Sequence, residues 1–122
     1  MAYGSFEDLD VWQKSCDLAV NIYQTLKDCR DYGFKDQICR SAVSIPSNVA
    51  EGMERDSGKE RIHFLHIAKG SSAELRTQLL IAERIGLIEK LVAESFREQA
   101  VSISRMLHGL IKALQNKPSP AP

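Results

Sequence analysis

Two polar groupings in the sequence hold side chains whose types could do chemistry. The first is a stripe at helical steps of four, three and four residues, with Asn48 beside it: Arg40, Ser44, Ser47 and Glu51. A serine becomes a nucleophile when a histidine base lies in hydrogen-bond reach, and neither serine has a histidine at helical spacing. Inside a bundle, the stripe would instead form a network anchored by an Arg40–Glu51 pair. We therefore favour a structural or interface network over ligand or nucleic-acid contact.

The second grouping is basic. His63 and His66 lie three residues apart, a spacing that can bring two imidazoles near one metal ion. A zinc site needs three or four ligands, and Glu60, the nearest carboxylate, is turned away from that face. We therefore expect a solvated helix face, with no metal and no cofactor. The remaining alternative is contact with nucleic-acid phosphates through six residues: Lys59, Arg61, His63, His66, Lys69 and Arg76.

No other pattern supports catalysis. The chain has no Gly-rich phosphate loop, no HExxH motif and no paired acid–base carboxylates, so we do not expect an enzyme. The three cysteines form no CxxC pair, and their odd number favours reduced thiols inside the cell. Cys16 and Cys39 lie among apolar residues and are expected in the core, whereas Cys29 is expected to be the most exposed.

Length and charge narrow the class of protein. The 122 residues fit one domain, expected over residues 1–116, and 16 basic side chains balance 16 acidic ones. The zero net charge therefore argues against a strongly basic nucleic-acid-binding protein. The charge is divided unevenly, because residues 1–57 carry a formal −4 and residues 58–122 a formal +4. No apolar run approaches the length of a membrane span and no secretion signal is evident, so we expect a cytoplasmic protein without a membrane partner.

Four amphipathic segments must position these side chains. The first has Asp10 as N-cap and ends at DCRDYG, where Gly33 is expected to take a positive φ. Its apolar face is expected at Trp12, Cys16, Ala19, Tyr23 and Leu26, widened by Val11, Leu18 and Ile22. The fourth segment runs from about Val92 to Asn116.

The two middle segments carry the polar groupings. The second has an apolar stripe that keeps its phase through Pro46, which predicts one kinked helix: Ile38, Ala42, Ile45, Val49 and Met53. The third is expected from about Lys59 to Ile85, between the N-cap Ser57 and a C-terminal Gly86. Its apolar surface is wider than a small bundle needs, with Ile62 and Leu80 to one side and Ile67 and Ile85 to the other.

These segments predict an all-α fold. Short connections between long amphipathic helices favour an antiparallel up-and-down four-helix bundle with a proline-kinked second helix. The proline-rich residues 117–122 cannot continue a helix and are expected to form a disordered tail.

Two runs then carry a family resemblance. QICRSAVSIPSNVAEG (37–52) and FLHIAKGSSAELRTQLLIA (64–82) resemble the 23S rRNA intervening-sequence proteins, also called four-helix-bundle proteins. The opening FEDLDVWQKSCDLAVNIY and the late MLHGLIKAL fit the same pattern. Cys39 and Ser41 depart from it, since the family commonly has a second arginine and an alanine there.

The resemblance implies a small bundle that assembles into a ring, typically a homopentamer. Some members are encoded within bacterial 23S rRNA genes, and related accessory proteins of diversity-generating retroelements bind a reverse transcriptase and nucleic acid. Ten signature positions are carried over and assigned to assembly and packing: Arg40, Ser44, Pro46, Asn48, Glu51, Gly52, Gly70, Ser71, Glu74 and Gln78.

The resulting hypothesis is a non-enzymatic ring that acts as an adaptor for nucleic acid or the ribosome. Its expected partners are its own copies, RNA or DNA, and a partner protein. The alternative is a homo-oligomeric protein-interaction scaffold without a nucleic-acid role.

Overall fold

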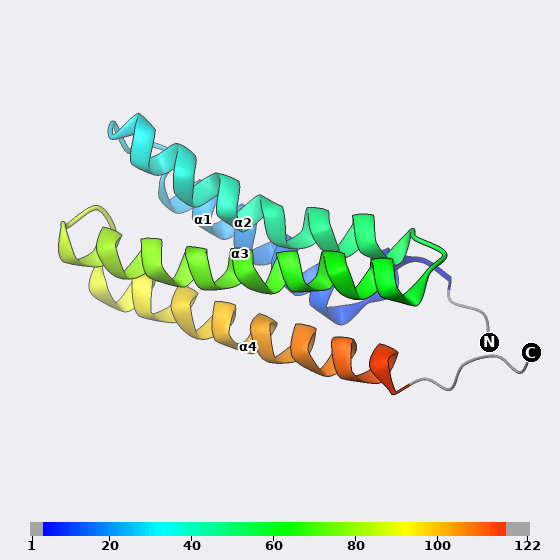
Figure 1. The fold of residues 1–122 in the computed structure, drawn as a ribbon. Coiled ribbons are helices and arrows are strands. Elements are labelled where there is room, and N and C mark those ends of the chain that lie inside the picture. Colours follow the sequence, from blue (N-terminus) through cyan, green and yellow to red (C-terminus); the bar gives the residue numbers. More distant parts are fainter. Residues whose placement is uncertain (1–3, 117–122) are drawn as a thin grey trace, which may run out of the picture.

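Four long helices make up the structure, a computed structural model that describes residues 4–116 (Figure 1). The expected tail at 117–122 lies outside these residues. A short 3-10 helix, η1 (Phe6–Asp8), precedes α1 (Asp10–Thr25), α2 (Tyr32–Met53), α3 (Gly58–Arg84) and α4 (Lys90–Gln115). The described residues contain no strand, and the all-α prediction is confirmed. None of the described helices combines the length and hydropathy needed to cross a membrane.

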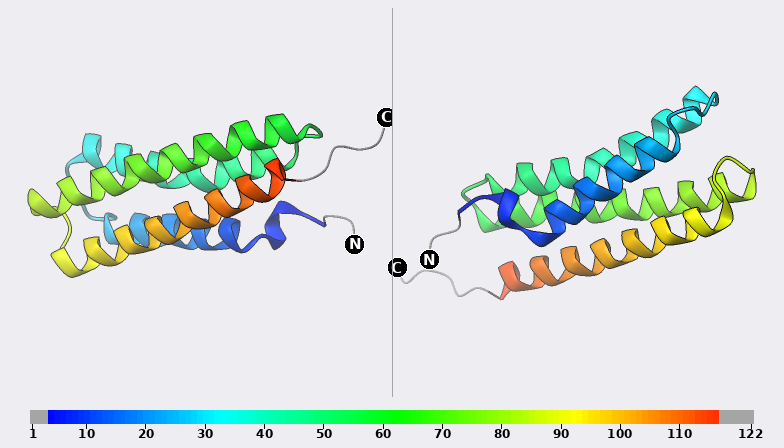
Figure 2. Two further views of the ribbon diagram at one scale, coloured as in Figure 1. Left: turned by 60° about the horizontal axis from the view of Figure 1, so that its bottom comes forward. Right: turned by 180° about the vertical axis from the view of Figure 1, so that it is seen from behind.

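Consecutive helices pack side by side. Ser44 of α2 meets Ser71 of α3, and Gly52, later in α2, faces Phe64, earlier in α3. These contacts make α2 and α3 antiparallel. Helix α1 packs on α2 and α4, and α4 packs on α3, so that α2 lies diagonally across from α4 (Figure 2).

One apolar core fills the space between the helices. The second helix buries the stripe expected of it, including Ile38, Ile45 and Val49, each fully inaccessible. Helix α1 differs from expectation, because its buried line runs through Val11, Ser15, Leu18 and Ile22, while Tyr23 is 53% exposed. Both candidate stripes had helical spacing, and packing against α2 and α4 decided which of them faces inward.

The helix ends agree with the sequence at two positions. The Ser57 hydroxyl accepts a hydrogen bond from the Glu60 amide at 3.3 Å, as expected of an N-cap. Gly86 has φ +79° and ends α3. The Leu87 amide donates to the Ala82 carbonyl at 2.8 Å, and the Gly86 amide donates to Glu83, which together form a Schellman motif.

Two expected helix ends were wrong. Asp10 is the first residue of α1 rather than its cap, because η1 leads the chain in and the Leu9 carbonyl accepts from Trp12 and Gln13. Gly33 lies inside α2 and has no positive φ. The helix begins earlier because the Asp31 carboxylate accepts from the Phe34 amide at 3.2 Å.

Helix α2 continues through Pro46, so the expectation of one helix rather than two is confirmed. Pro46 is buried, and its ring adds to the packed face although it donates no backbone hydrogen bond.

Helices α2 and α3 approach closely at Gly52. A Cβ placed on Gly52 would lie 2.8 Å from the Phe64 Cβ and 3.1 Å from the Arg61 carbonyl oxygen. Neither neighbour is the free end of a flexible side chain, so this position requires glycine.

We predict that Gly52→Ala lowers the free energy of unfolding by about 1–3 kcal/mol, because the added methyl group would force the two helices apart. Urea unfolding followed by circular dichroism measures the change. Gly109→Ala in α4 is the matched control, since a Cβ there meets no atom within 4 Å. Loss of glycine entropy should make this control more stable by about 0.5–1 kcal/mol. Equal effects of the two substitutions would contradict the steric argument.

Candidate functional site

The polar stripe on α2 divides into separate groups. Arg40 pairs with Asp36 at 3.3 Å, and Glu51 pairs with Arg55 at 2.8 Å. The expected Arg40–Glu51 pair is therefore wrong. Eleven residues of helix rise separate these side chains by about 16 Å, and each finds an oppositely charged partner four residues away.

A smaller network forms from the middle of the stripe. The Ser44 and Ser71 hydroxyl oxygens lie 2.8 Å apart, and the Asn48 amide donates to the Ser44 hydroxyl at 2.9 Å and to its carbonyl at 2.8 Å. Ser71 is buried, whereas Ser47 is exposed and outside the network. These bonds link α2 to α3, and no histidine takes part in them. Their arrangement is that of a packing network rather than of an activated nucleophile.

The other signature positions are scattered around this network. Pro46 and Gly52 are buried, and Gln78 is half-buried with an Oε1 atom that has no hydrogen-bond partner. Gly70 and Glu74 are exposed. Thus the structure joins only Ser44, Asn48 and Ser71 through hydrogen bonds.

The six expected phosphate-contact residues do not form one surface. The Arg61 Nε atom donates to the Arg55 carbonyl at 2.6 Å and closes the turn between α2 and α3. His63 stands edge-on to Phe64, with ring centroids 5.3 Å apart. Lys59 and His66 are exposed, and no hydrogen bond or ion pair joins them to the other four residues. In the described part of the chain no three His, Cys, Asp or Glu side chains are grouped to hold a metal ion.

Lys69 and Arg76 instead meet basic residues from α4. Both line one open pocket of about 420 Å³ with Arg105 and His108, and the Lys69 Nζ atom lies 3.4 Å from the His108 Nδ1 atom. We call these four residues the α3–α4 basic surface. The geometry suits an anion, because long cationic side chains from two helices converge on one hollow.

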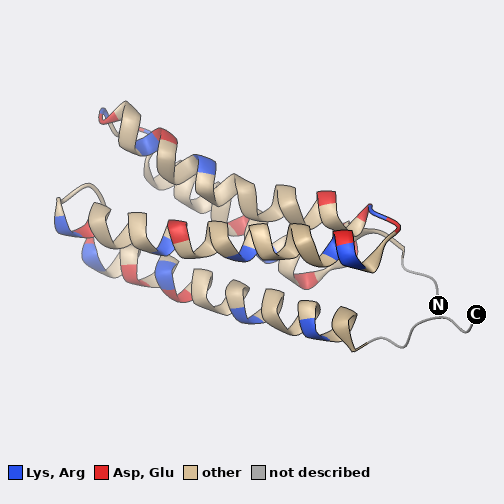
Figure 3. Ribbon diagram, viewed as in Figure 1, with Lys and Arg blue, Asp and Glu red and all other residues tan. Residues whose placement is uncertain are grey.

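The sequence held a signal for the two residues from α4. Arg105, His108 and Lys112 recur at steps of three and four, and no acidic residue occurs between 99 and 115. Figure 3 shows that the C-terminal half of α4 carries basic but no acidic positions. What the sequence alone did not show is that this half of α4 lies beside Lys69 and Arg76.

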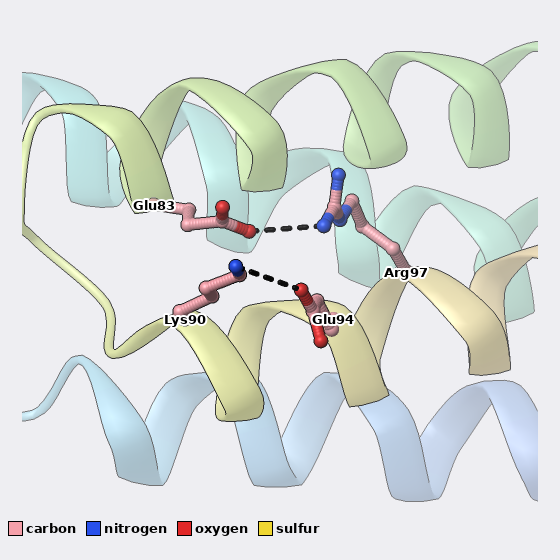
Figure 4. A network of polar contacts seen from close by, with 4 residues as sticks. All are labelled: Glu83, Lys90, Glu94 and Arg97. Carbon is pink, nitrogen blue, oxygen red and sulfur yellow. Dashed lines mark hydrogen bonds and ion pairs between the residues drawn. The ribbon is translucent and has the colours of Figure 1, made fainter.

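Ion pairs border the α3–α4 basic surface on one side. Arg97 donates to Glu83 at 2.9 Å, and Lys90 lies 4.0 Å from Glu94 (Figure 4). The Arg97–Glu83 pair joins α4 to α3 and is largely shielded, with side chains 27% and 16% exposed. No salt bridge among residues 4–116 joins the acidic half of the sequence to the basic half.

The solvent exposure of the three cysteines differs from the expectation. Cys29 is half-buried, as are Cys16 and Cys39, so it is not distinctly exposed. Burial raises the pKa of the Cys16 thiol, with a smaller contribution from Asp17. Burial is also the main cause that raises the pKa of Cys39. Both thiols therefore stay protonated at neutral pH, which is unfavourable for nucleophilic chemistry.

Comparison with known proteins gives a consistent assignment. The family model for the 23S rRNA-intervening sequence protein matches residues 7–109. The chain is also similar to a crystal structure of a protein with unknown function from the S23 ribosomal protein family of Bacteroides thetaiotaomicron. The TM-score is 0.78 at 29% identity, and the match covers 84% of this chain and 98% of the other. No curated protein matches at a significant level.

We predict that Ser44→Ala lowers the free energy of unfolding by about 1–2 kcal/mol, because Asn48 and the buried Ser71 would lose a hydrogen-bond partner. Chemical denaturation provides the measurement. Ser47→Ala removes the same hydroxyl from an exposed site on the same helix and should change stability by less than about 0.5 kcal/mol. Equal losses in the two variants would show that the hydroxyl network contributes nothing specific.

Proposed function

Because the chain belongs to the 23S rRNA-intervening sequence protein family, we propose that it is a non-enzymatic, cytoplasmic adaptor that associates with nucleic acid or the ribosome. The α3–α4 basic surface is the observation that carries this proposal. The resemblance noted in the sequence adds a homo-oligomeric ring, with the pentamer as the expected size.

The basic surface suits a phosphate backbone. Lys69 and Arg76 are seven residues apart, about 10 Å along the helix axis, so they can reach different phosphates of one strand. Arg105 and His108 supply donors from the neighbouring helix. Contacts of this kind give affinity without reading sequence, as expected of a protein that associates with structured RNA.

A zero net charge is compatible with this role. Phosphate binding depends on charges within about a Debye length, near 8 Å at physiological salt. Of the ten acidic side chains in residues 1–57, four lie in α1 and α2, and six lie in η1, the helix caps and the connections. None of the ten lines the pocket of the α3–α4 basic surface, and α2 makes no contact with α4. Their effect at the basic surface is therefore weakened by distance and by salt.

Ring assembly is supported by exposed isoleucines on α3. Ile67, Ile81 and Ile85 are 39%, 42% and 55% exposed, and their spacing puts them on one helix face. Ile62 and Leu80 lie on the other side of the wide apolar surface that the sequence predicts for this helix. Both are half-buried, and Ile62 packs against the core, so the face with Ile67 and Ile85 is the better interface. Glu74 interrupts this face between Ile67 and Ile81. Exposed apolar side chains that share one helix face are nevertheless typical of a protein-interaction site.

We further propose that the fold is an up-and-down bundle whose second helix is kinked at Pro46. Antiparallel contacts between consecutive helices support the first part. The kink is supported by the chemistry of proline: Pro46 has no backbone N–H, so one turn of α2 lacks its hydrogen bond.

We predict that Arg105→Ala weakens binding to a duplex RNA several-fold and lowers the slope of log K against log salt by about 1, because one phosphate contact is lost. Fluorescence anisotropy across a salt series gives both quantities. Arg40→Ala is the control, since it removes the same charge from an exposed site on α2, across the bundle from α4.

A wild-type protein that keeps its oligomeric mass but binds no RNA or DNA at low salt would favour the alternative function, a protein-interaction scaffold. Equal losses from Arg105→Ala and Arg40→Ala would show that the binding surface lies elsewhere.

We also predict that Ile81→Asp gives a smaller native mass than the wild type by light scattering, because a charge buried in an apolar interface is costly. Leu91→Asp is the matched control: Leu91 is 69% exposed and belongs to α4 rather than to α3. An Ile81→Asp protein of wild-type mass would place the interface on another face.

A further inference from the structure

A second pocket lies at the end of the bundle where the connection joins α1 to α2. It is open, has a volume of about 550 Å³, and is lined by Tyr23, Tyr32, Gly33, Lys35, Asp36 and Cys39. We call it the tyrosine pocket. Tyr32 is 72% exposed and Tyr23 is 53% exposed, so neither ring is placed there by core packing.

The charged groups of the tyrosine pocket are not equivalent. Asp36 is paired with Arg40 at 3.3 Å. The Lys35 Nζ atom lies 5.8 Å from the centroid of the Tyr23 ring and donates to the Lys27 carbonyl at 3.1 Å. An ammonium has three donors, so two of them are left for a ligand. Within the described residues Lys35 forms no salt bridge, and the pocket therefore offers a cation beside two aromatic rings.

We infer that the tyrosine pocket binds an unstacked nucleobase of a single-stranded segment, with Lys35 at the attached phosphate. Bases splayed out of loops and ends stack on aromatic side chains, and this stacking tolerates any base. Gly33 adds no side chain, and the position of its missing Cβ meets no atom within 4 Å, so space remains for a planar ring.

This inference rests on the proposed association with nucleic acid but assigns a different site. The basic surface lies between α3 and α4 and would bind paired or unpaired backbone alike. The tyrosine pocket belongs to α1 and α2 and would act only where a base is free. A proline-rich peptide also docks in aromatic grooves. The unpaired cation favours the nucleotide, because a nucleotide combines an aromatic ring with an anion.

The first test uses a mononucleotide, so that it does not depend on binding of long RNA. AMP at millimolar concentration is titrated into the labelled full chain, and amide shifts are followed by NMR. We expect saturable shifts at Tyr32, Gly33 and Lys35 that are lost in Tyr32→Ala and kept in Tyr32→Phe. Tyr32 is exposed, so both variants should fold. Ribose 5-phosphate, which keeps the phosphate but lacks the base, should leave the Tyr32 and Gly33 amides unshifted.

The second test compares a short single-stranded oligo(A) with a duplex RNA. Tyr32→Ala should weaken single-strand binding about tenfold and leave duplex binding unchanged, because only a free base can stack. Arg105→Ala should weaken both, so a failure of the basic surface is distinguishable from a failure of the pocket.

Three results would overturn the inference: no amide shift with AMP, equal shifts with ribose 5-phosphate, or shifts with a PxxP peptide but not with AMP. An equal effect of Tyr32→Ala on single-stranded and duplex RNA would overturn the stacking role as well.

Discussion

The fit between α2 and α3 depends on Gly52, which faces Phe64 and the Arg61 backbone without a side chain of its own. This contact fixes how far one helix slides along the other, and in this register the Ser44 and Ser71 hydroxyls meet two turns away. Helix α3 is then oriented so that its opposite side reaches α4. There the Ser72 hydroxyl bonds to the Ala100 carbonyl at 2.9 Å, and Lys69 approaches His108. The α3–α4 basic surface thus follows from packing that begins at a distant glycine.

Polar residues have two separate uses in this bundle. Buried or half-buried groups, such as Ser71 with Ser44 and Glu83 with Arg97, pair with one another across neighbouring helices. Each such bond adds little net stability, but together they disfavour other registers of one helix against the next. A helix shifted along its neighbour would leave these polar groups without hydrogen-bond partners. Exposed groups such as Arg40 with Asp36 contribute little to either stability or register. A stripe of polar residues in a sequence therefore mixes both kinds, and only the three-dimensional contacts separate them.

Much of the fold was accessible from sequence because it depends on local periodicity. The apolar stripe of α2, the Ser57 cap and the Gly86 terminus each require only a few neighbouring residues. The Arg40–Glu51 pairing was wrong because a shared helix face does not shorten an eleven-residue separation. Arg105 and His108 were missed because their meeting with Lys69 depends on the relative position of two helices. The tyrosine pocket was missed for a related reason: the spacing of Tyr23 suggested core, and packing of the whole α1 helix turned it outward.

An even number of helices brings the chain back to the end of the bundle at which it starts. The start of η1 and the C-terminal end of α4 lie at the same end of the bundle, opposite the α1–α2 and α3–α4 connections (Figures 1 and 2). A domain fused at either terminus, or a linker joining the two in a circularly permuted chain, would therefore occupy that end alone. The other end, with the tyrosine pocket, would remain open to solvent. The two ends of the bundle therefore differ: the chain enters and leaves at one end, and the tyrosine pocket lies at the other.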